Sequence, residues 1–212
     1  MEEVIPGLHA SAPEPLPFAP SLHIRAFLLR RDEGNLLLYA APTVGAEAER
    51  IEQLGGVSRH YLNHWHEASF GCDSVEAPLV CHESDRPSVA EKCSVDETFS
   101  TRAMVGDDFE LIPTPGHTRG ATAYLWHGDE HRCLFTGDSL YLSEGEWIAA
   151  VLDSSDRDSY IESLELIRGL DFDVLVPWAA SGGQPYIAMT DAADARRRID
   201  AVIERVRSGG DH

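Results

Sequence analysis

The sequence predicts an α/β layered fold, and the order of its apolar patterns indicates this. Short apolar runs bounded by turn residues occupy most of the first two thirds of the 212 residues. A long amphipathic helical pattern, a buried strand and a second helical pattern then follow. Strands first, then alternating strands and helices, favour a sheet sandwich covered by helices over a helical bundle. The length and composition predict one domain over residues 1–212.

The first segments are predicted to form a hairpin followed by a helix. The apolar runs HIRAFLLR (23–30) and NLLLYAA (35–41) are typical of strands, and the turn-forming stretch 31–34 joins them. Residues 46–54 place apolar side chains on one helical face, and a Gly-Gly pair ends that pattern. We therefore expect a β-hairpin and a helix in this order.

Shorter strands are expected through the middle of the chain. Three apolar runs predict single strands: VSRHYL (57–62), APLVCH (77–82) and DFELIP (108–113). A helical or irregular stretch around 88–93 separates the second from the third. TAYLWH (122–127) and HRCLFTG (131–137) are joined around Gly128-Asp129, which indicates a second hairpin.

The last third of the chain changes to a helical period. Apolar residues three and four apart predict a helix from Asp158, with Asp156 or Asp158 as its N-cap. DVLVP (173–177) is typical of a buried strand. Thr190 opens a last helix with acidic residues in its first turn, where the helix dipole favours them.

The chain is strongly acidic. It carries 36 Asp and Glu against 17 Lys and Arg, a formal charge of −19, and its sequence pI is near 4.7. Nucleic acid and anionic membranes repel such a surface, so we expect neither as a partner. The apolar runs are shorter than the roughly 18 to 20 residues that span a bilayer, and the start MEEVIPG lacks a basic signal region. These features predict a soluble, cytoplasmic protein.

The cysteines predict no disulfide framework. Cys72, Cys81, Cys93 and Cys133 form no C-x-x-C pair, and no secretion signal is expected. We therefore expect reduced and mostly buried thiols. Cys81 and Cys133 lie inside strand-like apolar runs, where a thiol behaves as a small apolar group.

Three histidines and one aspartate carry the chemical signal of the sequence. His64 and His66 follow the strand expected at 57–62, and residues two apart in an extended chain point the same way. His117 in PTPGHT and Asp138 in FTGD each follow a strand, where layered α/β folds place their sites. This donor set suits Zn²⁺ first, with Fe, Mn or Co behind it. No G-x-S-x-G, P-loop or G-x-G-x-x-G pattern offers a competing chemistry.

The order of these motifs resembles that of the metallo-β-lactamase superfamily over nearly the whole chain. That family carries H-x-H-x-D-H, T-P-G-H-T, F-T-G-D, a helix of S-L-x-x-L type and a strand ending in P-G-H-G. The counterparts here are HWHEAS, TPGHT, FTGD, SYIESLELI and VLVPWAA. The resemblance implies a four-layer αβ/βα sandwich with the site at one edge. It also implies metal ligands at His64, His66, His117 and Asp138.

The departures from the family pattern imply one metal in place of two. Ala68 and Ser69 stand at the last two ligand positions of H-x-H-x-D-H, and Ala179 stands at the His of P-G-H-G. By the resemblance, these positions belong to the second metal, whereas the ligands of the first metal and the bridging aspartate are kept. Tyr39 replaces a supporting aspartate. Trp178 replaces a glycine, and its indole either fills the volume of the second ion or packs in the core.

The leading expectation is a metal-dependent hydrolase with one zinc ion, acting on an ester, thioester, lactone or amide of a small molecule. The metal would acidify water and polarise the substrate carbonyl, and Asp138 would be a fourth ligand or the proton acceptor. One alternative is a mononuclear iron oxygenase using His64, His117 and Asp138. Another is a non-catalytic binding protein with a decayed site. The substrate and the oligomeric state stay open.

Other polar residues are assigned lesser roles. Glu67 is expected to be a solvated carboxylate at a helix entry, with a shifted ligand or proton acceptor as the alternative. Arg119 is expected either in a surface ion pair or at an anionic substrate group. The remaining histidines divide between structural positions beside strands and exposed positions at a hairpin and a tail: His60 and His82, then His127, His131 and His212.

Molar salt is predicted to stabilise the fold. The acidic excess, with Lys92 as the only lysine, resembles the composition of proteins from halophilic archaea, whereas a GC-rich coding bias would explain only the missing lysines. Self-repulsion of the surface weakens as the Debye length falls to about 3 Å at 1 M salt. Thermal melts should therefore have a markedly higher midpoint in molar KCl than in dilute buffer. A midpoint that stays flat across this range contradicts the halophilic interpretation.

Overall fold

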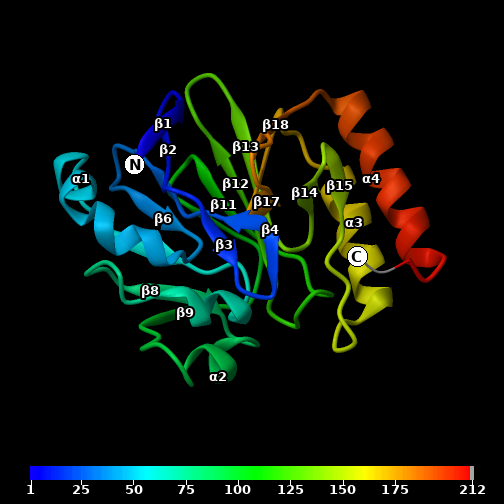
Figure 1. Ribbon diagram of the computed structural model, residues 1–212, viewed down its shortest axis with the longest axis horizontal. Coiled ribbons are helices and arrows are strands. Elements are labelled where there is room, and N and C mark those ends of the chain that lie inside the picture. The colour runs from blue at the N-terminus through cyan, green and yellow to red at the C-terminus, as the bar shows by residue number, and fades with distance from the viewer. Residues whose placement is uncertain (211–212) are drawn as a thin grey trace.

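The computed structural model describes residues 1–210 and arranges them in four layers (Figure 1). Helix α1 (Ala48–Gln53) packs on the outer face of the first sheet. Helices α3 (Arg157–Arg168) and α4 (Ala192–Arg207) pack on the opposite side, against the other two sheets. This order of layers confirms the predicted sandwich. In the described part of the chain, no helix is both long and apolar enough to cross a bilayer.

The first sheet has seven strands. Their order across the sheet is β1 (Glu2–Ile5), β2 (Leu8–Ala10), β5 (Phe27–Leu29), β6 (Leu36–Leu38), β7 (Arg59–Tyr61), β8 (Leu79–His82) and β9 (Glu97–Phe99). β5 and β6 pair antiparallel, which confirms the first predicted hairpin. β6, β7, β8 and β9 run parallel, so their carboxyl ends lie at one edge.

The other two sheets lie beside each other under α3 and α4. The second sheet has the order β10 (Ala103–Val105), β11 (Phe109–Pro113), β12 (Thr122–His127), β13 (Arg132–Gly137), β16 (Val174–Pro177) and β18 (Ala188–Met189). The third has the order β15 (Glu146–Ile148), β14 (Tyr141–Ser143), β17 (Ala179–Ser181), β4 (Ala19–Ile24) and β3 (Glu14–Leu16). β12 and β13 form the second predicted hairpin. β11 and β13 both run antiparallel to β12, so their carboxyl ends point to the same edge.

The helices begin close to where the sequence places them. Of the two N-cap candidates for α3, Asp156 is the cap, and Asp191 caps α4; each carboxylate accepts N–H groups of the first turn. The expected helix at 46–54 is shorter and follows a 3₁₀ turn. The short helical elements are η1 (Pro42–Glu47), η2 (Trp65–Phe70) and α2 (Arg86–Val89).

The second sheet is covered on both faces, and alternate apolar side chains along its strands pack on opposite sides. Leu111 and Phe135 point toward the first sheet, whereas Ile112 and Leu134 point toward α3 and α4. Successive strand residues face opposite sides, so each strand contributes to two cores. The ends of β11 and β13, which lead to the polar motifs, therefore emerge from strands packed on both faces.

The expectation of reduced thiols is wrong for two cysteines. Cys72 and Cys93 form a disulfide, with their Cα atoms 6.2 Å apart, whereas Cys81 and Cys133 are buried and free. The bond joins the chain just after η2 to the chain just after α2. These thiols are 21 residues apart, and no local pattern indicates that they meet.

Glu67 is buried, so the expectation of a solvated carboxylate is also wrong. Its side chain has no exposed surface, and it accepts N–H bonds from Ala40 at 3.0 Å, Asn63 at 2.9 Å and His64 at 3.2 Å. Ala40 follows β6, and the other two residues follow β7. Burial raises the pKa of Glu67, although the His64 imidazole and the N–H donors oppose this shift. One carboxylate thus ties the ends of two parallel strands to η2.

When the protein is unfolded without a reductant, a thiol assay is expected to detect two reactive thiols, those of Cys81 and Cys133. A disulfide closing a loop of this length stabilises a fold by about 2–4 kcal/mol, so Cys72→Ser/Cys93→Ser should lower the free energy of unfolding by about that amount. Denaturant unfolding measures the loss. Reduction of the wild type should reproduce it, and reduction of the double variant should add nothing. Four reactive thiols in the wild type contradict the bond.

Glu67→Ala is expected to lower the free energy of unfolding by about 3 kcal/mol or more. It leaves three buried backbone N–H groups without an acceptor, and each costs about 1 kcal/mol or more. Glu67→Gln keeps one acceptor oxygen and should recover part of the loss. Glu91→Ala removes an exposed carboxylate and serves as the control, with a change within about 0.5 kcal/mol. Equal losses for the two alanine variants contradict the role assigned to Glu67.

Candidate metal site

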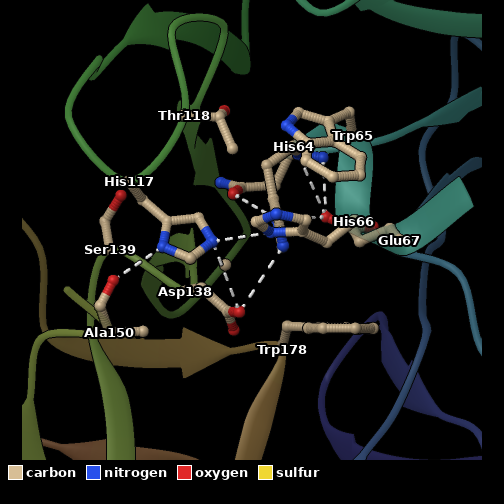
Figure 2. Close-up of polar contacts among 12 residues, drawn as sticks. His64, Trp65, His66, Glu67, His117, Thr118, Asp138, Ser139, Ala150 and Trp178 are labelled. Carbon is tan, nitrogen blue, oxygen red and sulfur yellow. Dashed lines mark hydrogen bonds and ion pairs between the residues drawn. The ribbon is translucent and has the colours of Figure 1, made fainter. Parts of the chain in front are cut away.

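The four residues singled out by the sequence come together where strands of two sheets end. β7 of the first sheet leads into His64 and His66, whereas β11 and β13 of the second sheet lead to His117 and Asp138. Figure 2 shows the three imidazoles and the carboxylate turned toward one another. Residues from three separate strand ends thus form one cluster.

The inward-facing atoms of this cluster lie at the separations of metal ligands. The four ligand atoms all lie within 4.8 Å of one another. His66 Nδ1 lies 3.0 Å from His117 Nε2, and Asp138 Oδ2 lies 3.5 Å from His64 Nε2 and 3.6 Å from His117 Nε2. Ligands bonded to a tetrahedral ion at about 2.0–2.2 Å stand roughly 3.3–3.6 Å apart. The cluster therefore already has close to the dimensions that an ion requires.

The outward nitrogens of two imidazoles face acceptors. His117 Nδ1 donates to the carbonyl oxygen of Ala150 at 2.7 Å, which leaves the lone pair of Nε2 facing the cluster. His64 Nδ1 lies 3.1 Å from Asn63 Oδ1 and 3.1 Å from Glu67 Oε1, so its Nε2 also faces inward. Acceptors behind a histidine fix its tautomer and orientation and raise its basicity as a ligand.

One inward nitrogen has no hydrogen-bond partner. His64 Nε2 is buried, and within residues 1–210 it forms no hydrogen bond. His66 Nδ1 and His117 Nε2 face each other at 3.0 Å, where two lone pairs repel unless a proton or a cation lies between them. Imidazole nitrogens with a carboxylate are the borderline donors that divalent transition metals bind. The residues present therefore fit a transition-metal ion.

The charges of the cluster shift the pKa values of the three imidazoles in opposite directions. Burial disfavours a charged His64, but the Asp138 and Glu67 carboxylates outweigh it and raise the pKa of His64 to about 10. Burial and the positive charge of His64 lower the pKa of His66 to about 3 and that of His117 to about 4. The charges around the cluster thus favour an added proton on His64 over one on His66 or His117. A bound cation would compete with that proton.

Asp85 carries no sequence signal of a site residue, yet it links the two histidine segments. It is 3% exposed and accepts the Trp65 N–H at 3.0 Å, the Thr118 hydroxyl at 2.7 Å and the Gly120 N–H at 2.8 Å. Trp65 separates the first two histidines, and Thr118 follows His117 directly. This carboxylate therefore sets the position of one histidine segment relative to the other.

Tyr39 stands where the family resemblance leads to an aspartate, and it holds the turn before Asp138. Its buried hydroxyl donates to the Val176 carbonyl at 2.7 Å and accepts the Gly137 N–H at 2.9 Å. Gly137 has φ +55°, and a Cβ there would overlap the side chain of Asn63. A neutral hydroxyl thus positions this turn without adding a second negative charge.

The three positions where the family resemblance implies ligands of a second metal carry small side chains. Ala68 and Ala179 are buried, and Ser69 is exposed at the edge of the cluster. Trp178 is 2% exposed, its indole N–H donates at 2.8 Å to a carbonyl that follows β6, and its ring packs edge-on against His64 at 5.3 Å. The indole therefore packs in the core and forms a wall of the site at once.

The cluster lies at the floor of a cavity of about 660 Å³. His66, His117 and Asp138 line this floor, and Trp178 lines a wall. Small-molecule sites commonly measure about 300–1,000 Å³. The cavity is thus large enough for a substrate to reach the cluster.

The remaining polar residues lie away from the cluster. His60 is buried, with Nε2 2.9 Å from the Tyr39 carbonyl, and His82 is buried in β8, so both are structural as expected. His127 is exposed, and the partly exposed His131 faces Asp173 at 3.4 Å. Arg119 is exposed and forms no ion pair with any described residue. His212 lies outside the described residues.

Known proteins share this fold at low sequence identity. A metallo-β-lactamase from Pontibacter korlensis superposes with a TM-score of 0.72 at 16% identity, covering 97% of each chain. One from Hirschia baltica gives 0.69 at 11% identity, over 95% of this chain and 96% of the other. An archaeal superfamily protein from Sulfolobus tokodaii gives 0.62 at 16% identity, over 92% and 85%. No curated protein sequence matches the chain.

A family model matches the segment that builds the site. It describes the metallo-beta-lactamase superfamily and aligns with residues 48–179. This range contains His64, His66, His117 and Asp138. It also contains the three positions that depart from the family motifs, Ala68, Ser69 and Ala179. The chain therefore belongs to the metallo-β-lactamase superfamily.

Proposed function

We propose that this protein is a hydrolase that holds one transition-metal ion, zinc in the first instance, through His64, His66, His117 and Asp138. The convergence of their ligand atoms within 4.8 Å of one another, at the floor of a cavity, carries this proposal. Superfamily membership supports an enzymatic role. The substrate is a small molecule with an ester, thioester, lactone or amide bond.

The side chains around the ion divide the remaining tasks. A bound metal would supply Lewis acidity, which polarises a carbonyl and lowers the pKa of water from near 16 to about 7. Asp138 is the only carboxylate among the residues lining the cavity, so it accepts the proton of a water that attacks there. Ala150 and Glu67 hold the imidazoles of His117 and His64 in the orientation that ligation requires.

A single ion is consistent with the side chains next to the cluster. Ala68 and Ala179 offer no donor atom, and the Trp178 indole lies beside His64, where its bulk leaves less room for a second ion. Within the described residues, one group of His, Cys, Asp and Glu has metal-ligand spacing. That group contains both the proposed ligands and the proposed proton acceptor.

One metal equivalent per chain is expected in protein reconstituted with Zn²⁺ and freed of excess metal. His64→Ala and His117→Ala should lose the metal, because each removes one of three imidazole ligands. His127→Ala removes an exposed histidine and should keep one equivalent. Elemental analysis gives the ratio. Two equivalents contradict the single-ion proposal, and none contradicts the site itself.

Hydrolysis should depend on this metal. Zinc-loaded protein should turn over members of a panel of neutral aryl esters, thioesters and lactones, with activity lost in His117→Ala and kept in His127→Ala. Asp138→Asn, compared at equal metal content, should reduce kcat by about 10²–10⁴-fold because it removes the proton acceptor. Oxygen uptake by iron-loaded protein in place of hydrolysis would identify an oxygenase. Metal binding without either reaction would indicate a binding protein.

A further inference from the structure

The cavity above the cluster has apolar walls. Most of the large side chains that line it carry no charge, among them Leu16, Phe18, Leu22, Phe70, Leu152 and Trp178. They come from the β3–β4 hairpin, from η2, from the chain after β15 and from the residue after β16. Four segments distant in sequence thus direct apolar groups at the space over one polar floor.

The rim of the cavity exposes large apolar side chains to water. Phe18 is 79% exposed, Leu152 43% and Trp65 37%, and all three line the cavity. Three of the six large apolar side chains that are exposed within residues 1–210 therefore lie at this one cavity. Exposed apolar groups gathered at a pocket mark a surface that becomes covered by an apolar ligand.

The walls of the cavity carry no cationic side chain. Neither Lys nor Arg is among its lining residues, and Asp138 is the one carboxylate there. A carboxylate or phosphate bound between the walls, away from the ion proposed at the floor, would lose its hydration without gaining a cationic side chain as partner. The ionisable side chains of the lining gather at the floor, in His66, His117 and Asp138, with the Tyr141 hydroxyl as a further polar group of the lining.

We propose that the site takes uncharged esters or thioesters whose acyl arm is apolar, a straight alkyl chain or an aromatic ring. The arm packs between Phe18, Leu152 and Trp178, and the carbonyl lies over the floor. This inference rests on the proposed hydrolase function for its reaction, but the binding of the arm does not. β-Lactam antibiotics carry a carboxylate, so this cavity disfavours them.

The reaction and the charge of the cavity fit together. Water adds its oxygen to the carbonyl carbon, the C–O or C–S bond breaks with its electron pair on the leaving group, and the proton lost by the water passes through Asp138 to that leaving group. The carboxylic acid formed gives its remaining proton to solvent, so the products are a carboxylate, a neutral alcohol or thiol, and a proton. The new carboxylate faces Asp138 and finds neither Lys nor Arg in the lining, so the side chains of the cavity do not retain it.

Straight-chain methyl ketones test the binding step without any bond to hydrolyse. Titration calorimetry on the protein as purified, from 2-hexanone to 2-undecanone, should show affinity rising about fourfold per methylene until the chain outgrows the cavity. In metal-free protein, where no ion takes a carboxylate, the fatty acid of equal chain length should bind at least about tenfold more weakly than the ketone. Phe18→Ser should weaken the longest ketone about fivefold or more, whereas Met104→Ser, at a side chain 50% exposed elsewhere, should not change it.

The outcomes separate this inference from the proposed function. Affinity independent of chain length, or a fatty acid that binds metal-free protein more tightly than the ketone does, overturns the apolar-arm inference whether or not the protein hydrolyses esters. Chain-length-dependent binding that is lost in Phe18→Ser supports it even when no ester is hydrolysed, and the hydrolase proposal then fails alone. A dimer that dissociates in Phe18→Ser, together with no ketone binding, assigns the rim to a second copy of the chain and overturns the inference.

Discussion

The geometry of the site depends on how the fold accommodates the buried carboxylate of Glu67. A charge removed from water is tolerated only when hydrogen bonds replace its hydration. Here the donors are backbone N–H groups at the ends of β6 and β7, so the requirement fixes where those strands end relative to η2. His64 belongs to this arrangement through both its N–H and its imidazole. Asp85 acts in the same way: its buried carboxylate accepts hydrogen bonds from Trp65 and from Thr118, which follows His117. The metal-competent cluster is thus preorganised by two carboxylates that do not belong to it.

The residues that depart from the family motifs place neutral side chains around the cluster. Tyr39 supports the Asp138 turn with a neutral hydroxyl, and Trp178 places a large apolar ring beside His64. Ala68 and Ala179 add no charge, and Asp138 is the one carboxylate that lines the cavity. Electrostatic interactions strengthen in such a surrounding, because fewer polar groups and less water screen them.

The layers and the cluster could be predicted from the sequence because their signals are local. Strand and helix periods repeat within a few residues, and His64, His66, His117 and Asp138 each lie within five residues after the end of a strand. The hydrogen bonds that hold the cluster in place could not be predicted, because they join residues far apart in the sequence. For example, 27 positions separate Ala40 from Glu67, and 98 separate Tyr39 from Gly137. Glu67 alone resembles any acidic residue at a helix entry, and only the burial of its surroundings removes it from solvent. The same holds for the Cys72–Cys93 bond.

The central claim is that four side chains at one edge of the sandwich hold one metal ion. Anomalous diffraction from crystals of the metal-loaded protein, recorded on both sides of the absorption edge of the metal, tests this most directly. The account predicts a single peak between His64 Nε2, His66 Nδ1, His117 Nε2 and the Asp138 carboxylate. A pair of peaks that extends toward Ser69 would contradict it, and so would a cluster without any peak beside an ion bound elsewhere.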